Sequence, residues 1–234
     1  MAKHHKLRHS KRHHKILAID VGGTHVKVML SPKSEKREFQ SGPDLAAKDM
    51  VAKVKDLTKD WDYDVVSMGY PGPVVHSRPL AEPHNLGIGW VGFDFAKAFD
   101  CPVKIVNDAA MQALGSYSGG RMLFLGLGTG LGSAMIIDGV IEPMEIGHLP
   151  YKRGKTFEHY LGNVGMKRVG VKKWRARVAA AVEHLTAALE PDYIVLGGGN
   201  AKKLRSLPPR ARLGDNENAF AGGFHLWDEH DNHA

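Results

Sequence analysis

Two segments of the chain share one pattern, in which an apolar strand passes through a glycine turn into a second strand. The first is ILAIDVGGTHVKVML at residues 16–30, and the second is MLFLGLGTGLGSAMII at residues 122–137. Short apolar runs on either side of clustered glycines predict strand, tight turn and strand. The repetition indicates a chain built from two halves of similar topology.

The order of the other elements predicts an α/β fold with mixed sheets. In the first half we expect a strand at 36–40, a helix from an Asp44 N-cap to Lys59, a strand at 65–68, a helix at 93–99, a strand at 103–106 and a helix at 109–117. In the second half we expect a strand at 140–146, a long helix at 172–189, a strand at 193–196 and a short helix opened by Gly197 to Asn200. Consecutive strands followed by strands joined through helices are typical of mixed sheets covered by helices.

Composition limits the class of protein. The 234 residues are 43% hydrophobic and 24% charged, which is ordinary for a globular protein. The single cysteine, Cys101, excludes an internal disulfide and a zinc site with several cysteines. No apolar run reaches the ~20 residues that span a bilayer, and no apolar segment follows the basic N-terminus as in a secretory signal. We therefore expect a cytoplasmic protein without a membrane partner.

Residues 1–15 form a basic leader, with six Lys or Arg residues, five histidines and no acidic residue. The formal charge of the whole chain is +7, so the remainder is close to neutral. Such a block is typical of a disordered, solvated tail, and the alternative is an arm that binds a polyanion. The spacing of the histidines fits no standard metal site.

Polar residues at the two glycine turns suggest phosphate binding. Asp20 ends the first strand, Gly22 and Gly23 allow close approach of backbone N–H groups, and Thr24 and Lys27 add a hydroxyl and a charge. The alternative is a plain hairpin, since Gly-Gly is a common turn. Neither turn fits G-x-G-x-x-G or the Walker pattern, and each leads into a strand instead of a helix.

Further polar residues follow other strands. Asn107 and Asp108 end an apolar run, and a carboxylate at a strand end can accept a proton from a reacting hydroxyl. The alternative for Asp108 is an N-cap of the next helix. Glu145 and His148 offer the acceptor and donor pair that suits a sugar hydroxyl. Asn85 lies in the long stretch 74–92, where it is either functional or a turn residue.

Several stretches, taken in order, resemble the ROK sugar-kinase family of the actin-like ATPase superfamily, and most of all its polyphosphate glucokinases. They are AIDVGGTHVKV, EPHNLGIGW, VNDAAMQALGSY, RMLFLGLGTGLGSAMI, EIGHLPY, YIVLGGGNAKKL and NAFAGGFHLW. The resemblance covers about residues 16–228. It implies two RNase-H-like lobes with an interlobe cleft: a first lobe at 16–117, a second at 118–217, and a helix at 218–228 able to pack back on the first.

The resemblance also implies roles for individual residues. Asp108 would be the catalytic base, and the sugar would be held by Asn85, Asn107, Asp108, Glu145, His148 and Glu158. Phosphates would lie between Asp20, Gly22, Gly23, Thr24 and Lys27 on one lobe and Gly128, Thr129 and Gly130 on the other. Asp20 would orient Mg²⁺ through water, which suits that ion. Gly198, Gly199 and Asn200 match a nucleotide-side turn.

One segment departs from the family pattern. Many ROK proteins carry zinc-binding cysteines shortly after E-x-G-H, whereas PYKRGKTFEHYLG has none. Ligand count excludes structural zinc there. We expect the loop that carries Glu158 to be held by packing of Tyr151, Phe157 and Tyr160.

These observations predict transfer of a phosphoryl group from inorganic polyphosphate, with ATP as a second donor, to the 6-hydroxyl of glucose. The alternatives are a strictly ATP-dependent gluco- or mannokinase and a non-catalytic protein that binds sugar or polyphosphate. The leader is too short for the DNA-binding domain of ROK repressors, so no nucleic-acid partner is expected. The family suggests a homodimer.

Overall fold

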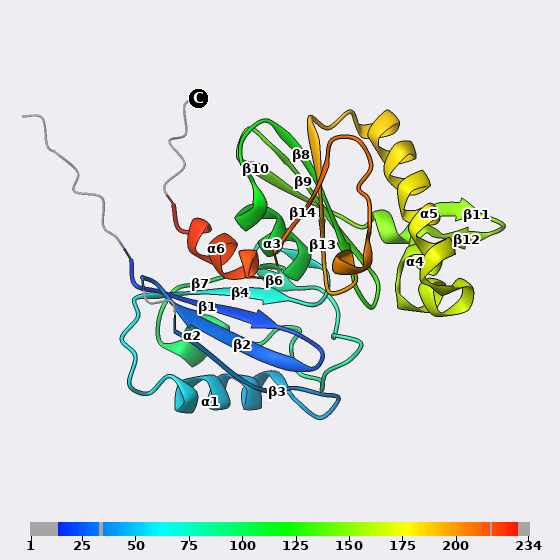
Figure 1. The fold of residues 1–234 in the computed structure, drawn as a ribbon. Coiled ribbons are helices and arrows are strands. Elements are labelled where there is room, and N and C mark those ends of the chain that lie inside the picture. Colours follow the sequence, from blue (N-terminus) through cyan, green and yellow to red (C-terminus); the bar gives the residue numbers. More distant parts are fainter. Residues whose placement is uncertain (1–13, 33–34, 216, 229–234) are drawn as a thin grey trace, which may run out of the picture.

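The computed structural model describes residues 14–32, 35–215 and 217–228, and it contains two five-stranded sheets with the same internal order. Most of the basic leader, residues 1–13, lies outside the described residues. The first sheet has the order β3-β2-β1-β4-β7 and the second β10-β9-β8-β13-β14. In each sheet the first three strands form an antiparallel meander and the rest are parallel to the central strand. The expected duplication and mixed sheets are therefore confirmed (Figure 1).

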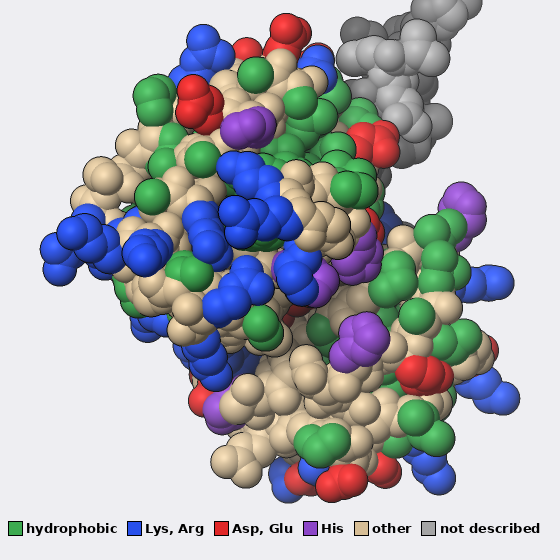
Figure 2. Space-filling view, turned by 90° about the vertical axis from the view of Figure 1, so that its right-hand side faces the viewer, with side chains coloured by type: hydrophobic (Ala, Val, Ile, Leu, Met, Phe, Trp, Pro, Cys, Tyr) green, Lys and Arg blue, Asp and Glu red, His purple; other side chains and the backbone are tan. Residues whose placement is uncertain are grey.

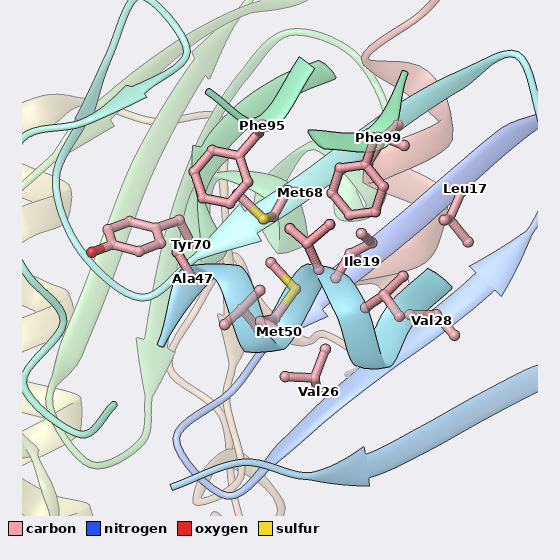
Figure 3. Packing of buried hydrophobic residues seen from close by; sticks show 14 of the residues in the cluster. Leu17, Ile19, Val26, Val28, Ala47, Met50, Met68, Tyr70, Phe95 and Phe99 are labelled. Atoms are coloured by element: carbon pink, nitrogen blue, oxygen red, sulfur yellow. The ribbon is translucent and has the colours of Figure 1, made fainter. Parts of the chain in front are cut away.

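The first sheet is built from β1 (Ile16–Val21), β2 (His25–Leu30), β3 (Lys36–Gln40), β4 (Val65–Tyr70) and β7 (Val103–Asn107). Helices α1 (Ala47–Leu57) and α2 (Phe95–Phe99) cover one face. Figure 3 shows Leu17, Ile19 and Val26 of the strands in the buried cluster that also contains Met50 of α1. This core fixes the sheet whose strand ends carry Asp20 and Asn107.

The second sheet is built from β8 (Arg121–Leu127), β9 (Leu131–Ile137), β10 (Val140–Met144), β13 (Tyr193–Gly197) and β14 (Ala211–Leu213). The long helix α5 (Asn163–Leu189) packs on it through Trp174, Val178 and Leu185. At Gly170 the backbone takes φ 76° and ψ 157°, so the helix is broken there into two segments.

Two helices lie between the sheets (Figure 1). They are α3 (Asp108–Ser116) and α6 (Asn218–His225), which pack on each other, while α6 also contacts β1 and β4 and α3 contacts β9. A Cβ at Gly115 would collide with the backbone carbonyl of Asn218, and one at Gly222 with that of Met111. These two glycines allow the helix backbones to meet, and α3 thereby connects the two sheets.

Smaller elements complete the chain. They are the hairpin β5 (Val74–Val75) and β6 (Arg78–Pro79), the hairpin β11 (Pro150–Lys152) and β12 (Lys155–Thr156), α4 (Phe157–Leu161), and two 3₁₀ turns, η1 (Ile146–His148) and η2 (Ala201–Lys203). Among the described residues, no helix is both long and apolar enough to cross a membrane.

One expectation about the helices was wrong, and one helical segment was missed. Asp44 is not the N-cap of α1, which begins after Ala46 without a side-chain cap. The Leu45 side chain is buried and its carbonyl accepts a hydrogen bond from Gly87 N at 3.0 Å, so a tertiary contact holds this segment out of the helix. The helix expected at 172–189 is the second segment of α5, after the Gly170 break, and the first segment, which begins at Asn163, was not expected.

Candidate active site

Asp108 lies where the two sheets approach each other. A Cβ on Gly69 of β4 would be 3.5 Å from Asp108 Cα, and one on Gly132 of β9 would be 2.7 Å from Ala109 Cβ. The start of α3 is therefore wedged between strands of both sheets. Figure 2 shows the surface hollowed between the two halves of the molecule.

Burial, and then the neighbouring charge of Asp20, raise the pKa of Asp108 to about 7, with a smaller contribution from Glu145. The backbone N–H of Ala109 donates a hydrogen bond to Asp108 Oδ1 at 2.8 Å. This hydrogen bond lowers the pKa of Asp108 and so partly offsets the other effects. The charges of Asp20, at the end of β1, and of Glu145, after β10, thus both act on Asp108. A carboxylate with a pKa near neutrality suits a general base.

Asn107, and not Asp108, is the N-cap of α3. Its Oδ1 accepts from the N–H groups of Ala109 at 2.9 Å and Ala110 at 3.3 Å, and its Nδ2 donates to the Gly72 carbonyl at 3.1 Å. The capping of α3, considered above as an alternative role for Asp108, is therefore carried out by Asn107. Asn107 keeps one amide hydrogen for a sugar hydroxyl, and that contact stays a prediction.

The first glycine turn is bound tightly to the chain around it. Gly22 N donates to the His25 carbonyl at 3.0 Å, and Ser41 Oγ donates to the Gly22 carbonyl at 2.6 Å. Asp20 and Lys27 are cross-strand partners in the ladder of β1 and β2. Burial raises the pKa of Asp20, and the Lys27 charge partly offsets this. Thr24 is exposed at the tip of the turn.

Asn85 lies against this turn. A Cβ on Gly23 would be 3.2 Å from Asn85 Cβ, so a side chain at residue 23 would displace Asn85 by a few tenths of an ångström. The Asn85 side chain is exposed. The structure thus places this predicted sugar ligand beside the predicted phosphate turn.

Glu145 is the N-cap of η1 and His148 is its last residue, both in the second half of the molecule. His148 N donates to the Glu145 carbonyl at 3.0 Å, and His148 Nδ1 lies 3.8 Å from Glu145 Oε2. The His148 side chain is 73% exposed and the Glu145 side chain 55%, so both can reach a ligand. The Glu145 charge also contributes to the raised pKa of Asp108, which connects Glu145 with the candidate base.

The second glycine turn is joined to Glu158 of α4. The Leu131 N–H donates to Glu158 Oε2 at 3.2 Å, and a Cβ on Gly130 would collide with the same carboxylate. A Cβ on Gly128 would meet no atom within 4 Å, so its face is open. The structure therefore brings Glu158 to the turn that is predicted to hold phosphate.

The turn at Gly198, Gly199 and Asn200 braces the second glycine turn from behind. Asn200 is buried, and its Nδ2 donates to the Gly128 carbonyl at 3.1 Å and to Asn163 Oδ1 at 2.8 Å. Lys203 Nζ donates to Asn200 Oδ1 at 2.7 Å. The amide of Asn200 is thus committed to protein contacts, and a nucleotide contact of this turn stays a prediction.

Asn163 was missed by the reasoning from sequence. Its N–H donates to the Thr129 carbonyl at 3.1 Å, so the start of α5 also holds the second turn. Gly162-Asn163 before a helix would have been a usable signal, but Gly165 and Gly170 hid the first helical segment.

The loop that carries Glu158 is held by aromatic packing, as expected. Tyr151 and Phe157 stack with ring centroids 4.3 Å apart, and Tyr151 meets Tyr160 edge-on at 5.4 Å. These rings fix the hairpin β11–β12 onto α4 and so fix the position of Glu158.

Comparison with known proteins decides the family. Residues 16–166 match the ROK family. The chain belongs to the ROK family. Glucokinase of Pyrobaculum calidifontis is 25% identical over 80% of this chain and 80% of that protein. Polyphosphate glucokinase of Mycobacterium tuberculosis (strain CDC 1551 / Oshkosh) is 30% identical over 57% of this chain, which spans only 56% of that protein.

The ROK assignment agrees with the architecture. The crystal structure of inorganic polyphosphate/ATP-glucomannokinase from Arthrobacter sp. strain KM superposes with a TM-score of 0.76, at 23% identity, over 91% of this chain and 97% of that chain. The expected actin-like ATPase fold is thereby confirmed.

The carboxylates of this site suit a magnesium ion held mainly by water and substrate phosphates. Asp20 is one buried carboxylate beside a second, Asp108. Among the described residues, no group of three His, Cys, Asp or Glu side chains is arranged to hold a metal ion. Mg²⁺ is commonly held by one or two carboxylates with water and substrate phosphates, and the donor set here suits that mode.

Proposed function

We propose that this ROK-family sugar kinase transfers a phosphoryl group from inorganic polyphosphate to the 6-hydroxyl of glucose, with ATP as a second donor. The observation that carries the proposal is Asp108, a carboxylate with a pKa raised to about 7 at the junction of the two sheets. The first glycine turn comes from the first half of the molecule, and the second glycine turn and the pair Glu145 and His148 come from the second half.

In this proposal the sugar lies between Asp108, Asn85 and the pair Glu145 and His148. Asp108 takes the proton of the attacking hydroxyl as the new phosphate ester bond forms and the bond to the leaving phosphate breaks. The open face of Gly128 and the turn at Gly22 and Gly23 offer N–H groups to the donor phosphates. Asp20 would orient Mg²⁺ through water, and the ion, when bound, would supply positive charge to the donor phosphates.

The choice of polyphosphate as the donor rests on the Lys and Arg side chains near the candidate site. Lys and Arg side chains gather on the face of the second half that borders the hollow (Figure 2). The sequence supplies Lys152, Arg153, Lys155, Lys167, Arg168, Lys172, Lys173, Lys202 and Lys203 in this half. A long polyanion gains from each cation it neutralises, at a cost in salt sensitivity, whereas ATP has too few charges to use them all.

The test is a glucose phosphorylation assay with polyphosphate and ATP in parallel. We expect transfer from polyphosphate with a KM that rises steeply with NaCl, and more steeply than the KM for ATP. Glucose phosphorylation from ATP alone, with none from polyphosphate of any chain length, would leave a kinase but refute this donor. Loss of transfer from both donors would favour a non-catalytic binding protein.

A strictly ATP-dependent kinase is the second candidate. Gly198 has φ 80° and lies against the backbone of Leu127, so the predicted nucleotide turn directly adjoins the second glycine turn. A homodimer and a cytoplasmic location stay predictions.

A further inference from the structure

A pocket of about 600 Å³ lies between the hairpin β11–β12, α4 and α5. Five basic side chains line it, and its lining contains no acidic residue. They are Lys152, Arg153, Lys155, Arg168 and Arg177. Two tyrosines and two alanines complete the wall. The pocket is thus a concave site of one sign of charge, which concentrates anions.

The charge of this basic pocket is not neutralised by the protein. Within the described part of the chain, none of the five side chains forms an ion pair at 4.0 Å or less. Arg177 Nη1 is buried without a hydrogen-bond partner. Arg168 uses Nη2 to donate to the His159 carbonyl at 3.1 Å. A buried guanidinium donor without a partner in the protein is costly, and Arg177 is one of the residues that line the pocket.

Tyrosine rings hold the cations in place. The guanidinium groups of Arg168 and Arg177 lie 5.4 Å and 5.0 Å from the centroid of the Tyr160 ring. Lys152 Nζ lies 4.8 Å from the centroid of the Tyr151 ring, and Tyr160 Oη donates to the Lys152 carbonyl at 3.2 Å. These contacts position the charges before any ligand arrives, which lowers the entropic cost of binding.

The basic pocket adjoins the candidate active site through α4. On this helix Glu158 reaches the second glycine turn at Leu131, whereas Tyr160 faces the pocket. A ligand that begins at the turn and continues along the molecule would meet the pocket on the other side of a five-residue helix.

We propose that the basic pocket binds the part of a polyphosphate chain that extends beyond the reacting phosphate, as an anion site separate from the two glycine turns. The proposal rests on polyphosphate as the donor. The pocket suits condensed phosphate better than nucleic acid, because its aromatic faces are not free to stack on bases. Arg168 and Arg177 lie over Tyr160, and Tyr151 is stacked on Phe157.

The test compares Arg168→Gln and the double variant Arg168→Gln/Arg177→Gln with the wild type. For long-chain polyphosphate we expect kcat/KM to fall about tenfold in the double variant, the scale of one lost charge-assisted hydrogen bond. Values for tripolyphosphate and ATP should stay within about twofold, as for surface changes generally. The matched control is Arg205→Gln, an exposed arginine of the same half outside the pocket, which should leave all donors unchanged.

An equal fall for ATP, or no fall for long chains, would overturn the proposal. Arg168→Gln alone guards against misfolding, since Arg168 is exposed and Arg177 still packs on Tyr160. Binding of fluorescently labelled long-chain polyphosphate, followed by anisotropy without sugar, separates this proposal from the choice of donor. If the wild type binds the chain without transferring from it and the double variant does not bind, the pocket stands and only the donor is wrong. Equal binding by both proteins would refute the pocket.

Discussion

Burial and the neighbouring Asp20 carboxylate together raise the pKa of Asp108 to about 7, although the two residues are 88 positions apart. The interaction exists because Asp20 pairs with Gly69 of β4, and Gly69 lies against the Asp108 backbone at the start of α3. The second sheet packs against the same helix. Like charges that share a dehydrated site disfavour each other's ionised form. The carboxylate proposed as the base is thereby tuned by its position in the fold.

The first prediction concerns the pH dependence of turnover. The base must be ionised, so kcat/KM should fall as pH decreases through about 7. Glu145→Gln removes one of the charges that raise the pKa of Asp108, so it should move the acid limb to lower pH. A full pH profile of each protein measures this. Glu142→Gln, which changes an exposed carboxylate on β10, is the control and should leave the limb in place.

The second prediction separates activity from stability at Asp108. Asp108→Asn keeps the shape but removes the base, so kcat should fall about 100-fold or more. Near-normal kcat in this variant would refute the assignment.

The same substitution should stabilise the fold at high pH. Because the pKa is raised from 3.8 to about 7 on folding, the native state binds the proton more tightly, and stability falls as pH rises through that window. Relative to the wild type, Asp108→Asn should therefore gain on the order of 4 kcal/mol at pH 8 and less than about 1 kcal/mol near pH 4. Urea unfolding at both values measures this, and an equal change at both would contradict it.

The third prediction uses the two glycines of the second turn as a matched pair. An alanine at Gly130 would meet the Glu158 carboxylate, so Gly130→Ala should displace Glu158 and raise the KM for glucose. An alanine at Gly128 meets no protein atom, so Gly128→Ala should fold normally and raise the KM for the phosphoryl donor instead. Steady-state kinetics with each substrate varied separates the two. The same KM affected in both variants would mean that one of these roles is misassigned.

The fourth prediction concerns the support behind that turn. Asn200→Ala leaves the Gly128 carbonyl and Asn163 Oδ1 without their donor, and it should cost about 1–3 kcal/mol of unfolding free energy. Lys202→Ala, at an exposed neighbour, should change stability by less than about 0.5 kcal/mol. Urea unfolding of the two variants is the measurement. Equal stability would show that the buried amide is not a brace.

Elements with strong local signals were predicted closely. The hairpins at both glycine turns have apolar strands bounded by residues that favour turns, so β1 to β2 and β8 to β9 were expected from the sequence. The strand β14 was missed, because three residues with little apolar character carry no period that distinguishes a strand. The cap expected at Asp44 failed because Leu45 is recruited into the core and bonded to Gly87.

The candidate site also has features that the sequence predicts and features that only the folded structure shows. Asp20, Asp108, Glu145 and the glycine turns could be named from residue type and place along the chain. Their assembly could not, because it depends on α3 packing between two sheets through Gly69 and Gly132. The basic pocket combines a hairpin, α4 and α5, and Arg177 looks in the sequence like any solvated arginine on a helix.

The sequence by itself determined the duplicated strand–glycine–strand halves, the absence of cysteine ligands near Glu158 and the family. These properties are local, since apolar period, glycine placement and ligand count are read from neighbouring residues. Only the tertiary structure decided that Asn107 and not Asp108 caps α3, how far the pKa of Asp108 rises, and that the Asn200 side chain donates a hydrogen bond to the Gly128 carbonyl. Each of these depends on burial and on contacts between residues far apart in the chain. Burial raises the free energy of a charged carboxylate or an unpaired amide, and it exists only once the chain has folded.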